Sequence, residues 1–366
     1  MLSRRRFLLT AAAAPSLAPA LSWAEAGAPD LLAAAKTPET GHFTLLGLRR
    51  SGETVFSLPL PGRGHAAAAH PYRAEAVAFA RRPGTFALVI RCTDGAAIAK
   101  LTAPEGRHFY GHGVFSADGG LLYTTENAYE TGAGRVGIWD ASDGYRRLGE
   151  ISSGGIGPHD MALLPDGAAL VVANGGIRTH PASGREKLNL PEMAPNLSYL
   201  STVDGALIDQ VGPEAELRLN SMRHLAVAQS GLVAVAMQWQ GDPEDGVPLL
   251  AFHSLGAPGL LIAEAEPHQL ARMQGYAGSV AFDPSGVRAA ITSPRGGQVM
   301  AWNIEGGPPA LWRRPDVCGL ATAPEGWLAT DGIGGFFALA PDLAAKPLAR
   351  HGVAFDNHLI ALEKFS

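Results

Sequence analysis

The chain has 366 residues, of which 46% are hydrophobic and 17% are charged, and its formal net charge is −5. This apolar content excludes a disordered chain of high net charge, and the acidic balance excludes recognition of nucleic acid through a basic surface. The two cysteines, Cys92 and Cys318, form no CxxC pair, which excludes zinc-ribbon and iron–sulfur sites. The 45 glycines and 27 prolines favour many short strands joined by tight turns.

Residues 1–26 have the pattern of an export signal. Residues 3–9 read Ser-Arg-Arg-Arg-Phe-Leu-Leu, and an alanine-rich apolar stretch follows that is shorter than the roughly 20 residues of a membrane span. Small residues at Ala24 and Ala26 offer cleavage points. The arginines before Phe-Leu resemble a twin-arginine (Tat) signal, with an ordinary Sec signal as the alternative. We therefore expect Tat export to the periplasm, and no membrane span after cleavage.

Residues 27–41 are expected to be a linker, and a repeated pattern begins soon after it. In each unit an apolar run, often opened by histidine, turns at a polar residue before glycine and continues as a second apolar run. The turn glycines are Gly119, Gly167, Gly231, Gly286 and Gly326, at spacings of 48, 64, 55 and 40 residues. Four short strands in such a unit indicate a β-propeller blade, and the lack of a helical pattern between them argues against an α/β fold.

The repeat predicts six complete blades, at residues 64–104, 111–151, 157–211, 222–265, 276–313 and 317–349. Two strands near the C-terminus, His351–Phe355 and His358–Glu363, remain, as do two at the start, Phe43–Leu48 and Thr54–Leu60. Together they predict a further blade joined from both ends, because closing the ring removes exposed sheet edges. The expected fold is all-β, a seven-bladed β-propeller over residues 42–366, with six or eight blades as the alternatives.

Histidines open most of the predicted inner strands, whose first residues share one rim of a propeller's central channel. Five of the seven starts are histidine: His65, His112, His159, His224 and His351. The other two starts are Gly278 and Cys318. Neutral imidazole binds iron, copper, zinc and nickel, so the pattern predicts a transition-metal site, iron or copper, at this rim. The alternative is that Gly-His pairs hold loops by hydrogen bonds to the backbone, as in WD-type propellers.

Polar residues of the same rim are expected to orient these histidines or to contact a ligand. They are Glu126, Asn127, Asn174, Arg178 and Arg223. The longest insertion, residues 174–190, is basic in an otherwise acidic protein and could pair with an anionic ligand or a partner's carboxylates. GxSxG, HExxH and GxxxxGK(S/T) motifs are absent from the sequence, so no catalytic residue is predicted.

The segment from Arg107 to Pro181 carries a family resemblance, most specifically in residues 107–119, 123–127, 136–140, 156–160 and 172–181. It resembles an uncharacterised family of Tat-exported bacterial seven-bladed β-propellers in the YVTN and quinoprotein-dehydrogenase-like superfamily. Members are found beside imelysin-type iron-uptake proteins and di-haem thiol-oxidoreductase-like proteins. The resemblance covers nearly all of the mature chain. It implies a periplasmic role linked to iron acquisition, with imelysin-type or haem-containing periplasmic proteins as partners, and it carries over no catalytic residue.

Together these observations predict a monomeric, non-enzymatic periplasmic propeller that is accessory to the acquisition of iron or another metal. It would bind a metal, or a metal-handling protein, at the histidine-rich rim. One alternative is a metal-dependent propeller hydrolase or oxidoreductase, which needs several histidines and a carboxylate around one ion. Another is a scaffold that docks envelope proteins on an exposed apolar or aromatic patch, to which Tyr129 and Trp239 could contribute.

Overall fold

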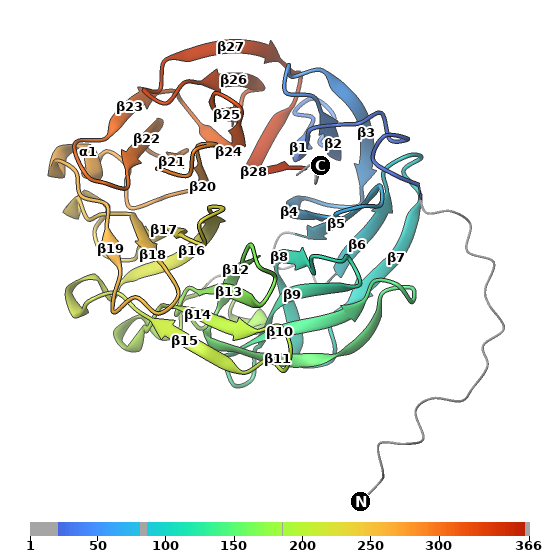
Figure 1. Cartoon of the computed structure of the whole chain (residues 1–366), viewed down its shortest axis with the longest axis horizontal. Coiled ribbons are helices and arrows are strands. Elements are labelled where there is room, and N and C mark those ends of the chain that lie inside the picture. Colours follow the sequence, from blue (N-terminus) through green and yellow to red (C-terminus); the bar gives the residue numbers. More distant parts are fainter. Residues whose placement is uncertain (1–20, 81–85, 185, 363–366) are drawn as a thin grey trace, which may run out of the picture.

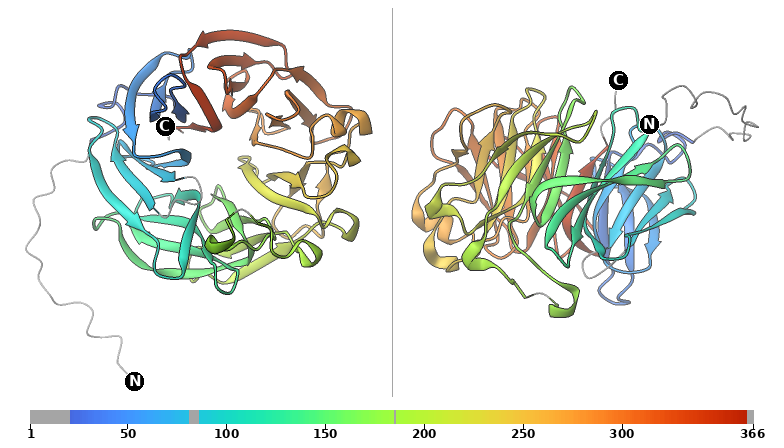
Figure 2. Two further views of the ribbon diagram at one scale, coloured as in Figure 1. Left: turned by 180° about the vertical axis from the view of Figure 1, so that it is seen from behind. Right: turned by 90° about the horizontal axis from the view of Figure 1, so that it is seen from below.

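Seven four-stranded antiparallel sheets stand around a central axis in the computed structural model, which describes residues 21–80, 86–184 and 186–362 (Figure 1). Seen from the side the ring is a flat disc (Figure 2). The predicted seven-bladed β-propeller is therefore confirmed. Within the described ranges, helical structure is limited to α1 (Pro267–Ala271) and four short 3-10 turns. None of the helices in that part is long and apolar enough to cross a membrane.

Each blade runs from an inner strand at the channel to an outer strand at the rim of the disc. Blade 1 comprises β4 (Gly64–Ala69), β5 (Glu75–Ala80), β6 (Phe86–Arg91) and β7 (Ala97–Thr102). Blade 2 comprises β8 (Arg107–Phe115), β9 (Leu121–Ala128), β10 (Ala133–Asp140) and β11 (Arg146–Ile156). Blade 3 comprises β12 (Pro158–Leu163), β13 (Ala169–Asn174), β14 (Asn196–Ser201) and β15 (Leu207–Val211).

The remaining blades follow the same order from the channel outwards. Blade 4 comprises β16 (Asn220–Val227), β17 (Val233–Trp239), β18 (Leu250–His253) and β19 (Leu261–Ile262). Blade 5 comprises β20 (Ser279–Phe282), β21 (Arg288–Ser293), β22 (Gln298–Asn303) and β23 (Ala310–Arg313). Blade 6 comprises β24 (Val317–Ala323), β25 (Gly326–Asp331), β26 (Gly335–Leu339) and β27 (Ala345–Arg350). Blade 7 comprises β28 (Ala354–Ala361), β1 (Leu31–Lys36), β2 (Phe43–Leu48) and β3 (Thr54–Leu60).

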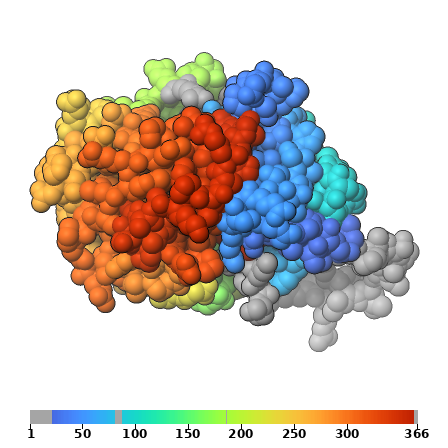
Figure 3. All heavy atoms as spheres, turned by 90° about the horizontal axis from the view of Figure 1, so that it is seen from above, coloured from blue at the N-terminus to red at the C-terminus, as the bar shows by residue number. Residues whose placement is uncertain are grey.

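Blade 7 joins the two ends of the chain, but it takes three strands from the start and one from the end instead of two from each. The segment 27–41, expected to be a linker, contains β1, whose Leu-Leu-Ala-Ala-Ala-Lys sequence is buried except for Lys36. Alanine is a poor strand former, and β1 is a strand because it pairs with β2 on one side and β28 on the other. The two expected C-terminal strands are one continuous strand. Figure 3 shows the red end of the chain against the blue start.

The apolar core lies between the blades. The described residues form seven hydrophobic clusters, and each fills the interface between two neighbouring blades. Strand β1 illustrates the pattern: Leu31, Ala33 and Ala35 pack toward blade 6, whereas Leu32 packs toward blade 1. This two-sided burial follows from the alternation of side chains along a strand. Each blade is therefore stabilised by both of its neighbours.

Residues 1–20, which hold most of the predicted export signal, lie outside the described residues. The described residues 21–26 contact blade 1, where Trp23 Nε1 donates a hydrogen bond to the His70 carbonyl at 2.8 Å. The export signal and its cleavage point stay predictions. Both cysteines are buried, free thiols.

Candidate functional site: a histidine cluster in the channel

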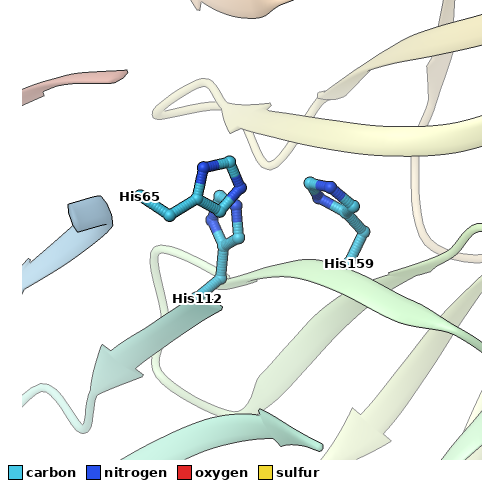
Figure 4. Close-up of side chains that lie close together, drawn as sticks. All are labelled: His65, His112 and His159. Carbon is cyan, nitrogen blue, oxygen red and sulfur yellow. The ribbon is translucent and has the colours of Figure 1, made fainter. Parts of the chain in front are cut away.

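Five imidazoles from five inner strands meet in the central channel. They belong to His65 on β4, His112 on β8, His159 on β12, His224 on β16 and His358 on β28. Pairs of neighbouring ring centroids are 4.7–5.7 Å apart. Figure 4 shows three of these rings approaching one another from three different blades. The histidines, four of them buried and His159 half-buried, form what we term the channel cluster.

Each of the five strands breaks its pairing register at or directly before its histidine. The residues within these breaks are 65–66 in β4, 110–112 in β8, 159 in β12, 223 in β16 and 356–358 in β28. Such β-bulges re-aim side chains, and here they accompany imidazoles that face the axis. Strand β20, which has no histidine, pairs in regular register. Strand β24 has a bulge but carries Cys318 there, and that thiol is buried in the core between blades 6 and 7.

A carboxylate fixes the orientation of His112. The Asp160 Oδ1 atom lies 3.0 Å from Nδ1 of His112, and the Oδ2 atom of Asp160 accepts a hydrogen bond from the Leu225 amide at 3.0 Å. Burial alone would raise the pKa of Asp160, but the His112 ring and the hydrogen bonds lower it below its usual range. An ionised carboxylate only accepts hydrogen bonds, so Nδ1 of His112 carries a proton, and Nε2 is the nitrogen of this ring that is left to bind a metal. A carboxylate behind a histidine is the usual support of a metal-binding imidazole.

A looser version of this arrangement supports His65. Its Nδ1 atom lies 3.8 Å from Oδ1 of Asp356, whose Oδ2 atom accepts a hydrogen bond from Nε of Arg63 at 2.7 Å. Asp356 belongs to the β28 bulge and Arg63 directly precedes β4. This chain of contacts therefore ties the channel cluster to the seam where the ring closes.

Two histidines of the channel cluster, His159 and His224, favour the uncharged form. Burial, followed by the positive charge of Arg223, lowers the pKa of His159 well below 6.5. Burial and then His112 lower the pKa of His224 in the same way, against the opposing charge of Asp160. Neutral imidazole is the form that binds metals.

Several ring nitrogens of the cluster lack hydrogen-bond partners among the described residues. They are Nε2 of His112, Nδ1 of His159 and Nδ1 of His224. A buried polar atom without a partner costs about 1–3 kcal/mol, and folded proteins leave few of them. A bound cation would satisfy these lone pairs.

The cluster offers two overlapping sets of three ligand atoms. One set is His65, His112 and His159, and the other is His112, His224 and His358; in each, the ligand atoms lie within 4.8 Å of one another. An ion with bonds of about 2.0–2.1 Å holds its nitrogens roughly 3–4 Å apart, so a small inward movement of the rings closes either set. His112 belongs to both sets. Donors that are all imidazole nitrogen suit copper, zinc, nickel and iron rather than magnesium or calcium.

A cavity of 430 Å³ opens from the cluster toward the rim that carries the starts of the inner strands. Three of the five histidines line it, together with Arg63, Tyr110, Arg223, Gln238, Tyr276, Pro294, Arg295 and Asn357. Solvent and small solutes therefore reach the cluster from this side. The insertion between β13 and β14 projects beyond one face of the disc (Figure 2, right).

The structure brings four of the five predicted histidines together and leaves His351 out. His351 precedes β28, and its ring lies 6.3 Å from that of Phe336 and 5.4 Å from that of Phe355. His358 occupies the channel instead. The first histidine after blade 6 was expected to start the inner strand, but β28 begins only at Ala354. One sequence signal could have identified His358. It is a polar residue directly before a histidine within an apolar run, as in Asn357-His358 and Arg223-His224.

Of the five polar residues expected beside the histidines, Arg223 alone lines the cavity. Glu126 is fully buried inside blade 2, where both of its oxygens accept hydrogen bonds from Arg147 at 2.7 and 2.9 Å. Asn127 donates to the Thr179 carbonyl at 3.2 Å, and Arg178 donates to the Glu130 carbonyl at 2.9 Å.

Asn174 also links two blades through hydrogen bonds to Ser153. Its Nδ2 atom donates to the Ser153 carbonyl at 2.8 Å, and its Oδ1 atom accepts from the Ser153 hydroxyl at 2.7 Å. These four residues hold blades 2 and 3 and the insertion together, whereas Asp160 and Asp356, which the sequence did not single out, contact the cluster.

The chain was compared with curated proteins, solved structures and protein families. No curated protein matched the sequence. Among solved structures, hydrazine synthase of Kuenenia stuttgartiensis is similar with a TM-score of 0.60 at 12% identity, over 85% of this chain and 89% of that one. That likeness concerns the fold alone. A family model described as "Protein of unknown function (DUF1513)" matches residues 58–362, which include every histidine of the channel cluster, and the chain therefore belongs to this family.

Proposed function

We propose that the protein binds a transition-metal ion, iron or copper, at the channel cluster and serves metal acquisition in the periplasm. The observation that carries this proposal is the convergence of five imidazoles, one of them backed by Asp160 at 3.0 Å. The predicted Tat signal and the family resemblance of residues 107–181 support the periplasmic role. An imelysin-type or haem-containing periplasmic protein would be the partner in acquisition.

Other histidines of the chain illustrate what a purely structural histidine does. The ring of His70 accepts hydrogen bonds from the Tyr72 and Arg73 amides and contacts the Gly119 carbonyl at 3.1 Å. The ring of His253 contacts the Tyr199 hydroxyl at 2.8 Å and the Ala257 carbonyl at 3.1 Å. Both nitrogens of each ring are satisfied. The unsatisfied nitrogens of His112, His159 and His224 instead favour ligation over a loop-holding role.

Metal titration of the purified mature protein tests this proposal. After metal removal, calorimetry with Cu²⁺ and with Fe²⁺ under anaerobic conditions should give one ion per chain for at least one metal. The double variant His112→Ala/His224→Ala should bind at least tenfold more weakly, because each ligand set loses a nitrogen. The matched control is His268→Ala, an exposed histidine on α1, which should bind as the wild type does. Binding below one ion per chain, or equal binding by the double variant, would contradict the proposal.

A further inference from the structure

The cavity above the channel cluster concentrates positive charge in a protein of net charge −5. Three arginines from three parts of the ring line it: Arg63 before β4, Arg223 on β16 and Arg295 between β21 and β22. No aspartate or glutamate is among the described residues that line it. Because Arg63 pairs with Asp356 at 2.7 Å, Arg223 and Arg295 carry most of the positive charge that this wall presents to an entering solute.

A fourth cation approaches from the insertion between β13 and β14. The Lys187 side chain is exposed, yet its pKa is lowered by partial burial and then by the charges of Arg223 and Arg295. Arg223 and Arg295 therefore both lie close enough to repel Lys187, and an anion bound to the two arginines would relieve that repulsion. A cleft lined by charges of one sign raises the local concentration of ions of the opposite sign.

Rigid elements hold the polar wall of this cavity. The Arg295 guanidinium lies 4.5 Å from the centroid of the Tyr276 ring, and the Tyr276 hydroxyl accepts a hydrogen bond from Nδ2 of Asn357 at 3.1 Å. Arg223 and Asn357 belong to the bulges of β16 and β28 that accompany the cluster histidines. The same backbone irregularities thus contribute both the imidazoles of the floor and the polar groups of the wall.

The dimensions favour an organic anion over a small inorganic one. A volume of 430 Å³ lies in the range of sites for small organic molecules and far exceeds what one phosphate fills. The planar fork of arginine pairs with a carboxylate through two parallel hydrogen bonds. Several cations spaced around one mouth match a ligand with several carboxylates.

We propose that this cavity binds a small polycarboxylate with two or three carboxylates, held by Arg223 and Arg295 directly above the channel cluster. The contacts to these side chains do not depend on a metal. A further contact, from one carboxylate oxygen of the ligand to the ion below, rests on the proposed function. The protein would then take a metal together with its organic chelator, rather than a bare ion.

Calorimetric titration of the metal-free mature protein with tricarballylate, a tricarboxylate that chelates metals weakly, tests the arginine contacts. The wild type should bind saturably at low ionic strength and lose affinity as salt is added. The Arg223→Gln/Arg295→Gln variant should bind at least tenfold more weakly. The control Arg313→Gln makes the same kind of substitution once, at an exposed residue of the outer strand β23, and should bind as the wild type does.

Two results would overturn this inference: no saturable binding of tricarballylate, or equal binding by the Arg223→Gln/Arg295→Gln variant with an unchanged unfolding temperature. Phosphate that binds as tightly as tricarballylate and competes with it would overturn the assignment to polycarboxylates. Because this arm uses metal-free protein, it is independent of the metal titration above.

Repeating the titration with copper-loaded protein tests the contact to the ion. Tricarballylate should bind more tightly to the copper-loaded wild type than to the metal-free wild type. In His112→Ala/His224→Ala, added copper should leave the tricarballylate affinity unchanged. An equal tricarballylate affinity for the loaded and the metal-free wild type would contradict the contact between the ligand and the ion, but not the contacts to the arginines.

Discussion

At the scale of single residues, the pairing of Asp160 with His112 explains how one imidazole can serve as a ligand in two overlapping sets. The carboxylate lies against Nδ1 of His112 and so leaves Nε2, which has no hydrogen-bond partner among the described residues, as the nitrogen that can bind a metal. Asp160 is itself fixed by two backbone amides, those of Met161 at 2.8 Å and Leu225 at 3.0 Å. A residue next to one cluster histidine thus positions the histidine of the neighbouring blade.

Replacing Asp160 tests this positioning role. The Asp160→Asn variant keeps the shape but loses the charge that fixes the tautomer of His112, and we expect a 10- to 100-fold weaker metal affinity. Competition with a coloured chelator measures that affinity. Asp166→Asn, at an exposed turn of blade 3, is the control and should leave it unchanged. An unchanged affinity in Asp160→Asn, with an unchanged unfolding temperature, would show that Asp160 does not position a ligand.

The lowered histidine pKa values predict a dependence of stability on pH. Below about pH 6.5, His159 and His224 become protonated in the unfolded chain but stay unprotonated in the folded protein. The free energy of unfolding therefore falls as the pH drops. The slope reaches about 1.4 kcal/mol per pH unit for each such group. His70, whose pKa burial lowers to about 4, adds a loss of the same sign.

Urea unfolding of metal-free protein at pH 7.5, 6.0 and 5.0 measures this dependence. The wild type should lose stability at each step, and His159→Gln/His224→Gln should lose less, since glutamine does not titrate. His268→Gln, which changes an exposed histidine, should follow the wild type. Parallel curves for the wild type and the cluster variant would mean that these two histidines are not shielded from protons.

At the scale of elements, the β-bulge is the feature that builds the site. In regular β pairing, alternate residues of an inner strand would point into the two blade interfaces, as those of β1 do. The bulges of β4, β8, β12, β16 and β28 interrupt that alternation where the histidines lie. The site therefore depends on backbone geometry as much as on the presence of histidine.

Glycine next to a bulged histidine makes one such geometry testable. Gly111 has φ +104°, and a Cβ atom there would lie 2.7 Å from Cδ2 of His65. We expect Gly111→Ala to displace the His65 ring, to weaken metal binding and to cost more stability than backbone strain alone. Gly106→Ala is the matched control, because Gly106 also has a positive φ of +74° but an added Cβ would meet open space.

Urea unfolding and metal titration of the two glycine variants separate these effects. Gly106→Ala should lose about 1–2 kcal/mol through its left-handed backbone and bind metal normally. Equal losses in the two variants, with normal metal binding in both, would contradict a role of Gly111 in seating His65.

The sequence predicted the repeated elements but not the details of register. The turn glycines and apolar runs were enough to predict seven blades. The histidines near strand starts were enough to predict four of the five members of the channel cluster. The alanine-rich β1 has no strand signal of its own, since its partners on both sides make it a strand. His358 was missed because the start of β28 is set by pairing with β1, which lies far away in the sequence. Glu126 and Asn174 were misplaced because polar residues on a rim also satisfy buried groups between strands.

At the scale of the whole molecule, the ring is closed by the last strand. Strand β28 lines the channel, pairs with β1 and packs against blade 6 through Phe355 and Leu359. It also carries His358 and Asp356, so closure and the site share one element. This arrangement couples the integrity of the ring to the completeness of the channel cluster.

Truncation after Arg350 tests this coupling. Removing residues 351–366 leaves β1 as an unpaired edge and uncovers the apolar interface of blade 6, so we expect aggregation and loss of cooperative unfolding. Adding a synthetic peptide of residues 351–366 should restore a monomer-sized species on gel filtration. A peptide with His358→Ala should restore the same species with weaker metal binding. A truncated protein that unfolds cooperatively at the wild-type temperature would contradict the closure role of β28.

An anomalous difference map of a copper-loaded crystal would locate the ion that the channel cluster is proposed to bind. With diffraction data collected at the copper absorption edge, we expect one strong peak in the channel, about 2.0–2.1 Å from Nε2 of His112 and bonded to at least two other histidines of the cluster. A channel without a peak, or copper found only at exposed histidines such as His268, would contradict it.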